Sequence, residues 1–284
     1  MRLSTVALLA LMVAAPEPTP QEIRARLSTY LAEYEPKLSE LIADERVVQH
    51  DVPMHEGRPG SESIRRRTLL SEVAFIALPG NAGWLGFRRV LKVDDAPVFD
   101  TLGALTATLA SGQKEDYARA RIMLNESARF NLGKPRTINL PNLPLELLQG
   151  QHAGRFSIRI AGSERIGGHR TTKLVLVENV SPTIVRELDG SDMRSIISAF
   201  VEPETGRLWR ADVIIRDPRP TVVQFDHIVS VTFEENRALG LVVPSRMRED
   251  FFSAEDRKAW GEATYANYRR FQTSARIVPQ GEGY

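Results

Sequence analysis

The chain has 284 residues, of which 42% are hydrophobic and 26% charged, and it contains no cysteine. This hydrophobic fraction excludes a disordered polymer. The 37 basic and 36 acidic residues leave a formal net charge of +1, which argues against a protein that coats nucleic acid by neutralising phosphates. The lack of cysteine excludes disulfides, thiolate nucleophiles and cysteine-ligated metal centres.

The first 15 residues have the layout of a secretory signal peptide. Arg2 precedes a run over 3–13 that is apolar apart from Ser4 and Thr5, and Ala14 and Ala15 supply small residues for cleavage. A transmembrane helix would need about 20 apolar residues, and neither this run nor any later segment is that long. We therefore expect a signal peptide at 1–15 and a mature protein in the periplasm or secreted. Without cysteine it cannot carry a lipoprotein anchor.

A helix is predicted over 20–44. Thr19 and Glu22 have capping-box spacing, and Pro20 fits the first helical position. Apolar residues then recur at spacings of three and four, which places them on one helical face. Pro36 predicts a kink or a break near Glu35.

A β-hairpin is predicted over 64–93, because two apolar and β-branched runs flank a glycine-rich turn at 79–83. Helical spacing then returns over 101–131, with a break at 111–112. Residues 134–150 contain three prolines and form a connector with at most one short helix near 145–149.

From residue 154 to 278 the apolar period changes to two, which is typical of β-strands. Short turn sequences separate the strands, and this favours an antiparallel meander over helical crossovers. The segments that fit strands are 154–160, 170–178, 195–202, 209–215, 222–233, 239–248 and 264–277.

These elements predict an α+β fold. We expect one strongly curved antiparallel sheet, a half-barrel meander with the helices packed on its concave side, because strands and helices alike offer one apolar face. Residues 16–284 are expected to form a single domain, and 134–150 is the best candidate for a boundary if there is one.

Catalytic and metal-binding patterns are not met. The chain lacks the Gly-x-Ser-x-Gly of a hydrolase, and the glycines over 80–86 lead into a strand and not into a phosphate-binding helix. His50, Asp51 and His55 lie close enough for a weak metal site, but exposed loop residues are the better interpretation. The sequence indicates no catalytic residue, no metal and no cofactor.

His227 falls on an otherwise apolar strand face. It is either a polar group that orients a ligand in a cavity or a core histidine with a hydrogen-bond partner. Trp209 has the same two interpretations, ligand contact or plain core. The residues that we expect to face a ligand cavity are Phe156, Ile158, Trp209, Val213, Phe225, His227 and Val229.

Two segments carry a resemblance. GWLGFRRVLKVDDAPV at 83–98 and YANYRRFQ at 265–272 resemble a group of uncharacterised exported bacterial proteins. The order of elements also resembles lipoprotein carriers of the LolA/LolB type. That resemblance implies a half-barrel with helices on its concave side and an apolar cavity for acyl chains.

Three functions follow as hypotheses. The first is an exported soluble protein that binds or carries a lipid or acyl chain. The second is an interaction or scaffold module that binds a cell-envelope protein and no ligand. The third and least favoured is a hydrolase that uses His50 and His55 or dispersed carboxylates. No nucleic-acid partner and no transmembrane span are expected.

Overall fold

The computed structural model describes residues 17–55, 58–59, 64–77, 84–99, 122, 124–133, 135–187, 189–218, 226–253 and 257–270. The predicted signal peptide, Phe225, most of the predicted 101–131 helices and the end of the predicted last strand lie outside these residues. Within them only 122 and 124–128 of the 101–131 region are helical.

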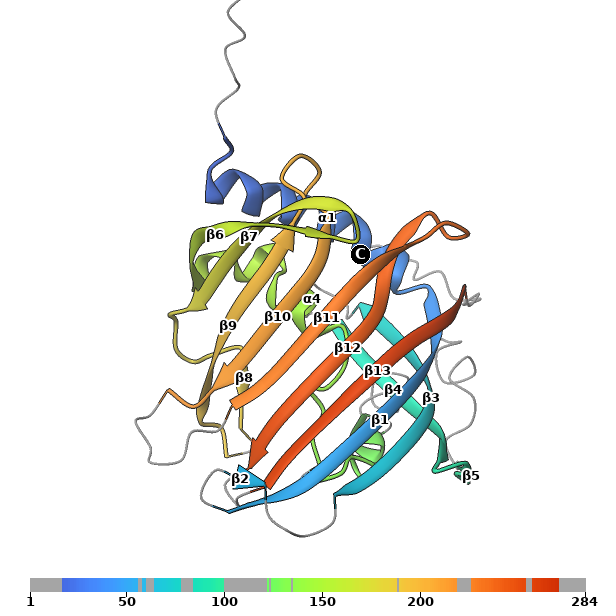
Figure 1. The fold of residues 1–284 in the computed structure, drawn as a ribbon. Helices are drawn as coiled ribbons and strands as arrows, with labels where there is room; N and C mark the ends of the chain where they lie inside the picture. The colour runs from blue at the N-terminus through green and yellow to red at the C-terminus, as the bar shows by residue number, and fades with distance from the viewer. Residues whose placement is uncertain are drawn as a thin grey trace, which may run out of the picture.

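Besides the helical stretch at 122 and 124–128, the described part of the chain forms the α-helices α1 and α4, a 3₁₀ helix and a set of strands (Figure 1). The helical elements are α1 (Pro20–Leu38), α4 (Leu143–Leu147) and η2 (Gly150–Arg155). The strands are β1 (Leu41–His55), β2 (Arg58–Pro59), β3 (Arg65–Ala77), β4 (Trp84–Val93), β5 (Ala96–Pro97), β6 (Phe156–Ile166), β7 (His169–Glu178), β8 (Val185–Arg186), β9 (Asp192–Val201), β10 (Leu208–Arg216), β11 (Asp226–Asn236), β12 (Leu241–Ser253) and β13 (Arg257–Arg270).

The strands pair antiparallel in the order β5-β4-β3-β1-β13-β12-β11-β10-β9-β7-β6. The predicted antiparallel sheet with a few helices is therefore confirmed. The predicted strong curvature is wrong, because the sheet is neither strongly curled nor closed. Its outermost strands, β5 and β6, stand at opposite ends of the order.

The N-terminal helix begins as predicted and ends earlier. The Thr19 hydroxyl accepts from the Glu22 amide at 3.2 Å, and the Glu22 carboxylate accepts from the Thr19 amide at 2.7 Å, which completes the capping box. The helix continues through Pro36 to Leu38, so it does not break near Glu35. Leu41 and Ile42, predicted to be helical, begin β1, where strand pairing on both sides overrides the helical spacing.

The predicted hairpin and meander join through one pairing that sequence reasoning did not foresee. β3 and β4 form the hairpin, and the strands from β6 to β13 form the meander. β1 lies between β3 and β13, so the first and the last described strand pair along their length. The predicted strand at 264–277 begins earlier, at Arg257, because β13 follows both β12 and β1.

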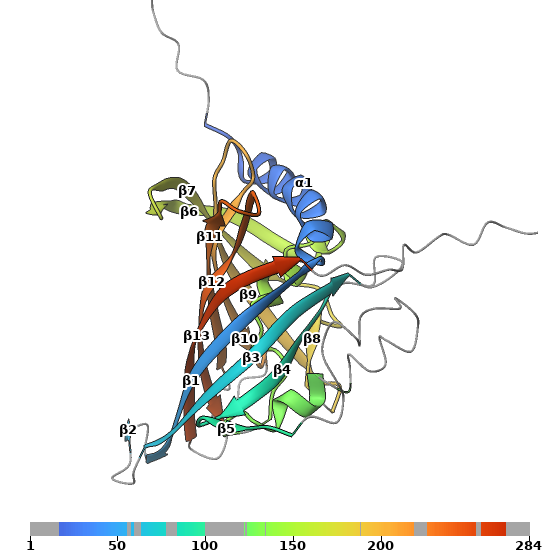
Figure 2. The same ribbon diagram turned by 90° about the vertical axis from the view of Figure 1, so that its right-hand side faces the viewer.

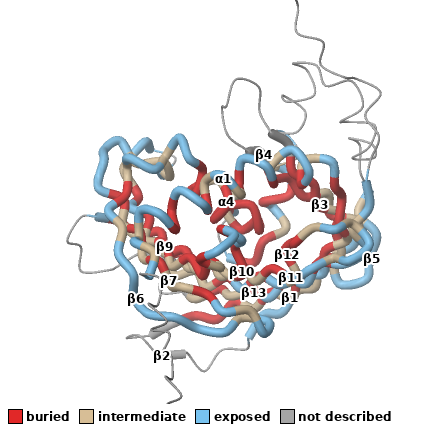
Figure 3. The backbone as a smooth tube through the Cα atoms, turned by 90° about the horizontal axis from the view of Figure 1, so that it is seen from above, coloured by how far each residue is buried: buried red, intermediate tan, exposed pale blue. Residues whose placement is uncertain are grey.

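Alternation along each strand sends one set of side chains to a core-facing side. On β1, Glu45, Val47 and Gln49 are buried, whereas Arg46 between them is exposed. Both α-helices lie on this same side of the sheet (Figures 2 and 3). The apolar stripe of α1 joins strand residues and the leucines of α4 in one core. The opposite side carries no described helix and is called the outer face below.

The turn between β9 and β10 fixes α1 by a close approach. Gly206 has φ +76°, and a Cβ on it would lie 2.3 Å from the Arg26 carbonyl oxygen. Arg26 also donates from Nη1 to the Pro203 carbonyl at 2.5 Å. Only glycine allows this turn to contact the helix backbone.

Candidate functional site

A cavity of about 440 Å³ lies where α1 meets the hairpin turns at the end of the sheet. We call it the rim cavity. Three segments line it: α1, the β9–β10 turn and the β11–β12 hairpin. The lining residues are Tyr30, Glu33, Tyr34, Lys37, Thr205, Arg207, Glu235, Asn236, Arg237, Gly240, Leu241 and Val242.

Two tyrosines of α1 form the aromatic wall of the rim cavity. The rings of Tyr30 and Tyr34 stack with centroids 5.4 Å apart and an interplanar angle of 16°. Burial raises the pKa of Tyr30 to about 12 and that of Tyr34 well above its ordinary value. Both phenols therefore stay neutral, and with Leu241 and Val242 they form the aromatic and aliphatic part of the lining.

Charged side chains surround this lining. Arg207 and Glu235 form an ion pair at 3.6 Å across the two turns. Lys37 and Arg237 make no ion pair with any described residue, and Glu33 is the remaining carboxylate. The lining of the rim cavity thus mixes aromatic and aliphatic side chains with charged ones. Two of its cations, Lys37 and Arg237, make no ion pair with a described residue.

The residues predicted to face a ligand cavity lie elsewhere. Phe156, Trp209, Val213 and Val229 are in the core, and Ile158 packs against it. None of them lines the rim cavity. The structure thus brings these side chains together as packing neighbours of the helices.

Trp209 stands at an irregularity that alternation alone could not reveal. The register between β10 and β9 shifts between Leu208 and Arg210, which places Trp209 in the bulge. Its ring stacks on His169 of β7 with centroids 3.6 Å apart. Trp209 is 2% exposed, so this contact, together with the core, accounts for its burial.

His227 is a core histidine, but not a hydrogen-bonded one. It is 4% exposed, and neither ring nitrogen has a hydrogen-bond partner in the described residues. Its Nε2 lies 3.8 Å from Oε1 of Glu249. Burial, together with the charge of Arg136, lowers the pKa of His227 to about 4 against the opposing effect of Glu249.

A buried polar network beside His227 was missed by sequence reasoning. Arg136 pairs with Glu249 of β12, and both side chains are at most 5% exposed. Gln49 of β1 donates to Asn131 at 2.8 Å and accepts from the Leu132 amide at 3.0 Å. These contacts hold the 131–142 segment on the core-facing side of the sheet. Apolar alternation gave no signal for this network, because the core-facing positions of β1 carry Glu45, Gln49 and Asp51.

One glycine lets the same segment approach β4. A Cβ on Gly86 would lie 2.1 Å from the side-chain oxygen of Asn142. Gly86 lies inside β4. The described part of the predicted connector, 135–150, therefore packs closely on the sheet, with Leu140, Leu145 and Leu147 in the core.

The structure does not assemble the weak metal site. His50 stacks on Trp260 on the outer face, with centroids 4.9 Å apart. Asp51, the next residue, points to the other face and pairs with Arg65. The described residues hold no group of three potential metal-ligating side chains, and no helix among them is long and apolar enough to cross a membrane.

Comparison with known proteins gives similarity in structure only. No family model and no curated protein matches the sequence. A DUF1329 family protein from Desulfovibrio piger is 10% identical, with 92% of this chain and 96% of that chain covered and a TM-score of 0.41. A putative outer membrane lipoprotein-sorting protein domain from Vibrio parahaemolyticus is 10% identical, covers 88% and 93%, and has a TM-score of 0.42. A LolA superfamily protein from Nitrosomonas europaea is 11% identical, covers 92% and 96%, and has a TM-score of 0.31.

Proposed function

We propose that this protein binds an amphiphilic ligand with an apolar tail, a lipid or acyl chain, in the rim cavity. The observation that carries the proposal is the cavity of about 440 Å³ between α1 and the two hairpin turns. Its volume lies within the range of about 300–1,000 Å³ that is typical of small-molecule sites.

The lining supports an apolar tail. Tyr30 and Tyr34 present stacked aromatic surface, and Leu241 and Val242 present aliphatic surface. Such sites bind mainly by burying apolar area, while a few polar groups fix orientation. We place the tail here, and not among Val213 and Val229, because those side chains are fully buried against the core.

The charges support an anionic head group. Lys37 and Arg237 stand at the rim cavity without a carboxylate partner in the described chain, whereas Arg207 is already paired with Glu235. A carboxylate or phosphate on the ligand would supply the missing counter-charge. Glu33 at the same rim disfavours a second negative charge.

Export belongs to the same proposal. The pattern at residues 1–15 would send the protein to the periplasm or the medium, where a carrier for lipids or acyl chains would work. The alternative, an envelope interaction module without a ligand, predicts that no lipid accompanies the protein.

The test is ligand binding by the purified protein. Mass spectrometry of organic extracts should find a co-purifying lipid, and a fluorescently labelled fatty acid should bind saturably. Leu241→Trp would fill the rim cavity and should abolish probe binding. Leu239→Trp is the matched control, because Leu239 lies in the same hairpin and packs against the core without lining the cavity. Equal probe binding by both variants, or no saturable binding by the wild type, contradicts the proposal.

A further inference from the structure

The outer face carries basic residues in register across the sheet. Arg46 of β1 lies opposite Thr264 of β13, which in turn lies opposite Arg246 of β12. Arg246 lies opposite Thr232 of β11, and Thr232 opposite Arg210 of β10. β1, β12 and β10, which are every second strand in this part of the sheet, therefore each present an arginine in one row that runs across the strands.

The same row continues to the next strands. Arg210 lies opposite Phe200 of β9, and Phe200 opposite Lys173 of β7. The Phe200 ring lies under both cations, 5.1 Å from the Arg210 guanidinium carbon and 5.4 Å from Lys173 Nζ. We call Arg46, Arg246, Arg210 and Lys173 the cation row. Neighbouring strands are about 4.8 Å apart, so adjacent members stand about 10 Å apart and the row spans about 29 Å.

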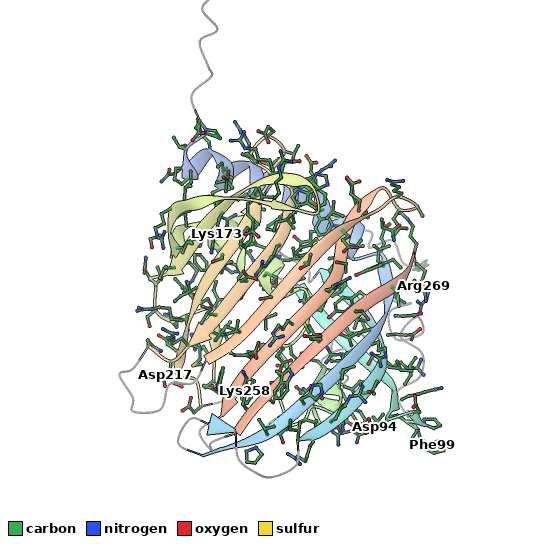
Figure 4. All side chains as sticks on the ribbon, in the orientation of Figure 1. Asp94, Phe99, Lys173, Asp217, Lys258 and Arg269 are labelled. Atoms are coloured by element: carbon green, nitrogen blue, oxygen red, sulfur yellow. The ribbon has the colours of Figure 1, made fainter. Side chains whose placement is uncertain are left out.

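All four members point away from the core. Each is followed along its strand by a buried core-facing residue: Val47, Met247, Ala211 and Leu174. No described helix covers this side of the sheet, which faces the viewer in Figure 1. Lys173 is labelled on this side, at the upper left, in Figure 4.

The charge of the cation row is only partly neutralised. Arg46 and Arg246 are exposed and make no ion pair with a described residue. Arg210 binds Asp212 of its own strand at 2.9 Å. In the adjacent row Glu262 pairs with Arg248 at 3.0 Å, so that carboxylate already has a partner. The row itself contains no acidic residue among the seven strands that it crosses.

Apolar side chains accompany the cations on the same face. Ile196, Ile214 and Ile228 lie opposite one another on β9, β10 and β11, and each is partly exposed. Trp260 is also partly exposed, with Lys258 Nζ 5.9 Å from its ring centroid. Basic residues, tryptophan and aliphatic groups on one surface suit the interface of a bilayer.

We propose that the outer face docks on an anionic membrane surface, with the cation row against the lipid head groups. The positive charge of the cation row is complementary to the negative charge of such a surface. Because the row crosses seven strands, its members can contact several lipid head groups at once. A nucleic acid or an acidic peptide would use the cations but leave Ile196, Ile214 and Ile228 without a role. The inference is independent of the ligand proposed for the rim cavity.

The test is co-sedimentation of the full chain with vesicles. The protein should bind phosphatidylcholine vesicles that contain phosphatidylglycerol, bind vesicles of phosphatidylcholine alone far more weakly, and dissociate as salt is raised. Arg46→Ser combined with Arg246→Ser should weaken binding about thirty-fold, given about 1 kcal/mol for each basic residue at an anionic surface. Both side chains are exposed, so the fold should be retained, which circular dichroism would verify.

The matched control is Lys37→Ser combined with Arg237→Ser, which removes two cations at the rim cavity. This variant should bind vesicles like the wild type and lose affinity for the fatty-acid probe, while the cation-row variant should show the reverse. Equal binding to neutral and anionic vesicles, or an equal loss of vesicle binding in both variants, overturns the proposal. Binding to soluble polyglutamate as tight as binding to anionic vesicles also overturns it, in favour of an acidic protein partner.

Discussion

Arg88 on β4 and Glu45 on β1 form a bidentate ion pair that is buried in the protein. Arg88 donates from Nε and Nη2 to the two carboxylate oxygens, with Nη2–Oε1 at 2.8 Å, and both side chains are at most 1% exposed. Nη2 also donates to the Asn139 carbonyl at 2.9 Å. One guanidinium therefore links two strands, which are separated in the sheet by β3, to the 131–142 segment.

Arg88→Met should lower the free energy of unfolding by about 3–5 kcal/mol, because it leaves the buried Glu45 carboxylate without its counter-ion. Arg89→Met is the control on the next residue, since Arg89 pairs with Glu72 at 3.4 Å on the half-exposed side. That change should cost under about 1 kcal/mol. Urea denaturation measures the free energy of unfolding of both variants. Similar decreases would show that the buried Arg88–Glu45 pair contributes no more to stability than the half-exposed Arg89–Glu72 pair.

His227 should make the protein less stable as the pH falls. Burial first, and then Arg136, lower its folded-state pKa from 6.5 to about 4. Between these two pH values His227 is therefore protonated in the unfolded chain and neutral in the folded protein. The stability contribution is complete above pH 6.5 and is lost as the pH falls towards 4, by up to about 3 kcal/mol. In His227→Leu this pH-dependent part should disappear. Parallel wild-type and variant curves of unfolding free energy between pH 4 and 7 would contradict the assignment.

Gly206→Ala should loosen the docking of α1. The new Cβ would meet the Arg26 carbonyl oxygen, and the residue would also have to hold φ +76°. We expect a loss of about 2–4 kcal/mol and faster proteolysis within α1. Gly168→Ala is the control, because Gly168 has φ +89° but open space around it, and should cost about 1–2 kcal/mol. Equal decreases in the free energy of unfolding for the two variants would mean that the contact of Gly206 with α1 does not contribute to stability.

Expression with residues 1–15 in place should yield a shortened mature chain outside the cytoplasm, because the pattern predicts cleavage after Ala15. N-terminal sequencing of the protein from a periplasmic extract checks this. A chain that keeps Arg2 and stays with the cytoplasmic fraction would contradict export.

Local chemistry was enough for several elements. The capping box of Thr19 and Glu22 set the start of α1, and the period-two alternation around Val213 and Val229 located strands. These signals act within a few residues and need no knowledge of the rest of the chain. The end of α1 was missed because Leu41 and Ile42 fit both a helix stripe and a strand, and the pairing with β13 and β3 decides between them.

The candidate site depends on contacts between residues far apart in the chain. Tyr34 and Leu241 line one cavity although they are separated by most of the meander. Sequence alternation placed His227 on the core-facing side but could not show that Glu249 and Arg136 stand beside it. Nor could it show the cation row, because register across seven strands is a property of the assembled sheet.

By itself the sequence determined that this is an antiparallel sheet protein with a capped N-terminal helix and without cysteine chemistry, since periodicity and composition are local properties. Only the tertiary structure decided that the sheet stays open, that the core-facing side is filled by α1, α4 and the 131–142 segment, and that the cavity lies at the rim. The physical reason is that several apolar segments could cover the core-facing side of the sheet. Which of them do so depends on how closely their side chains pack against the assembled strands, and that is not a local property of the sequence.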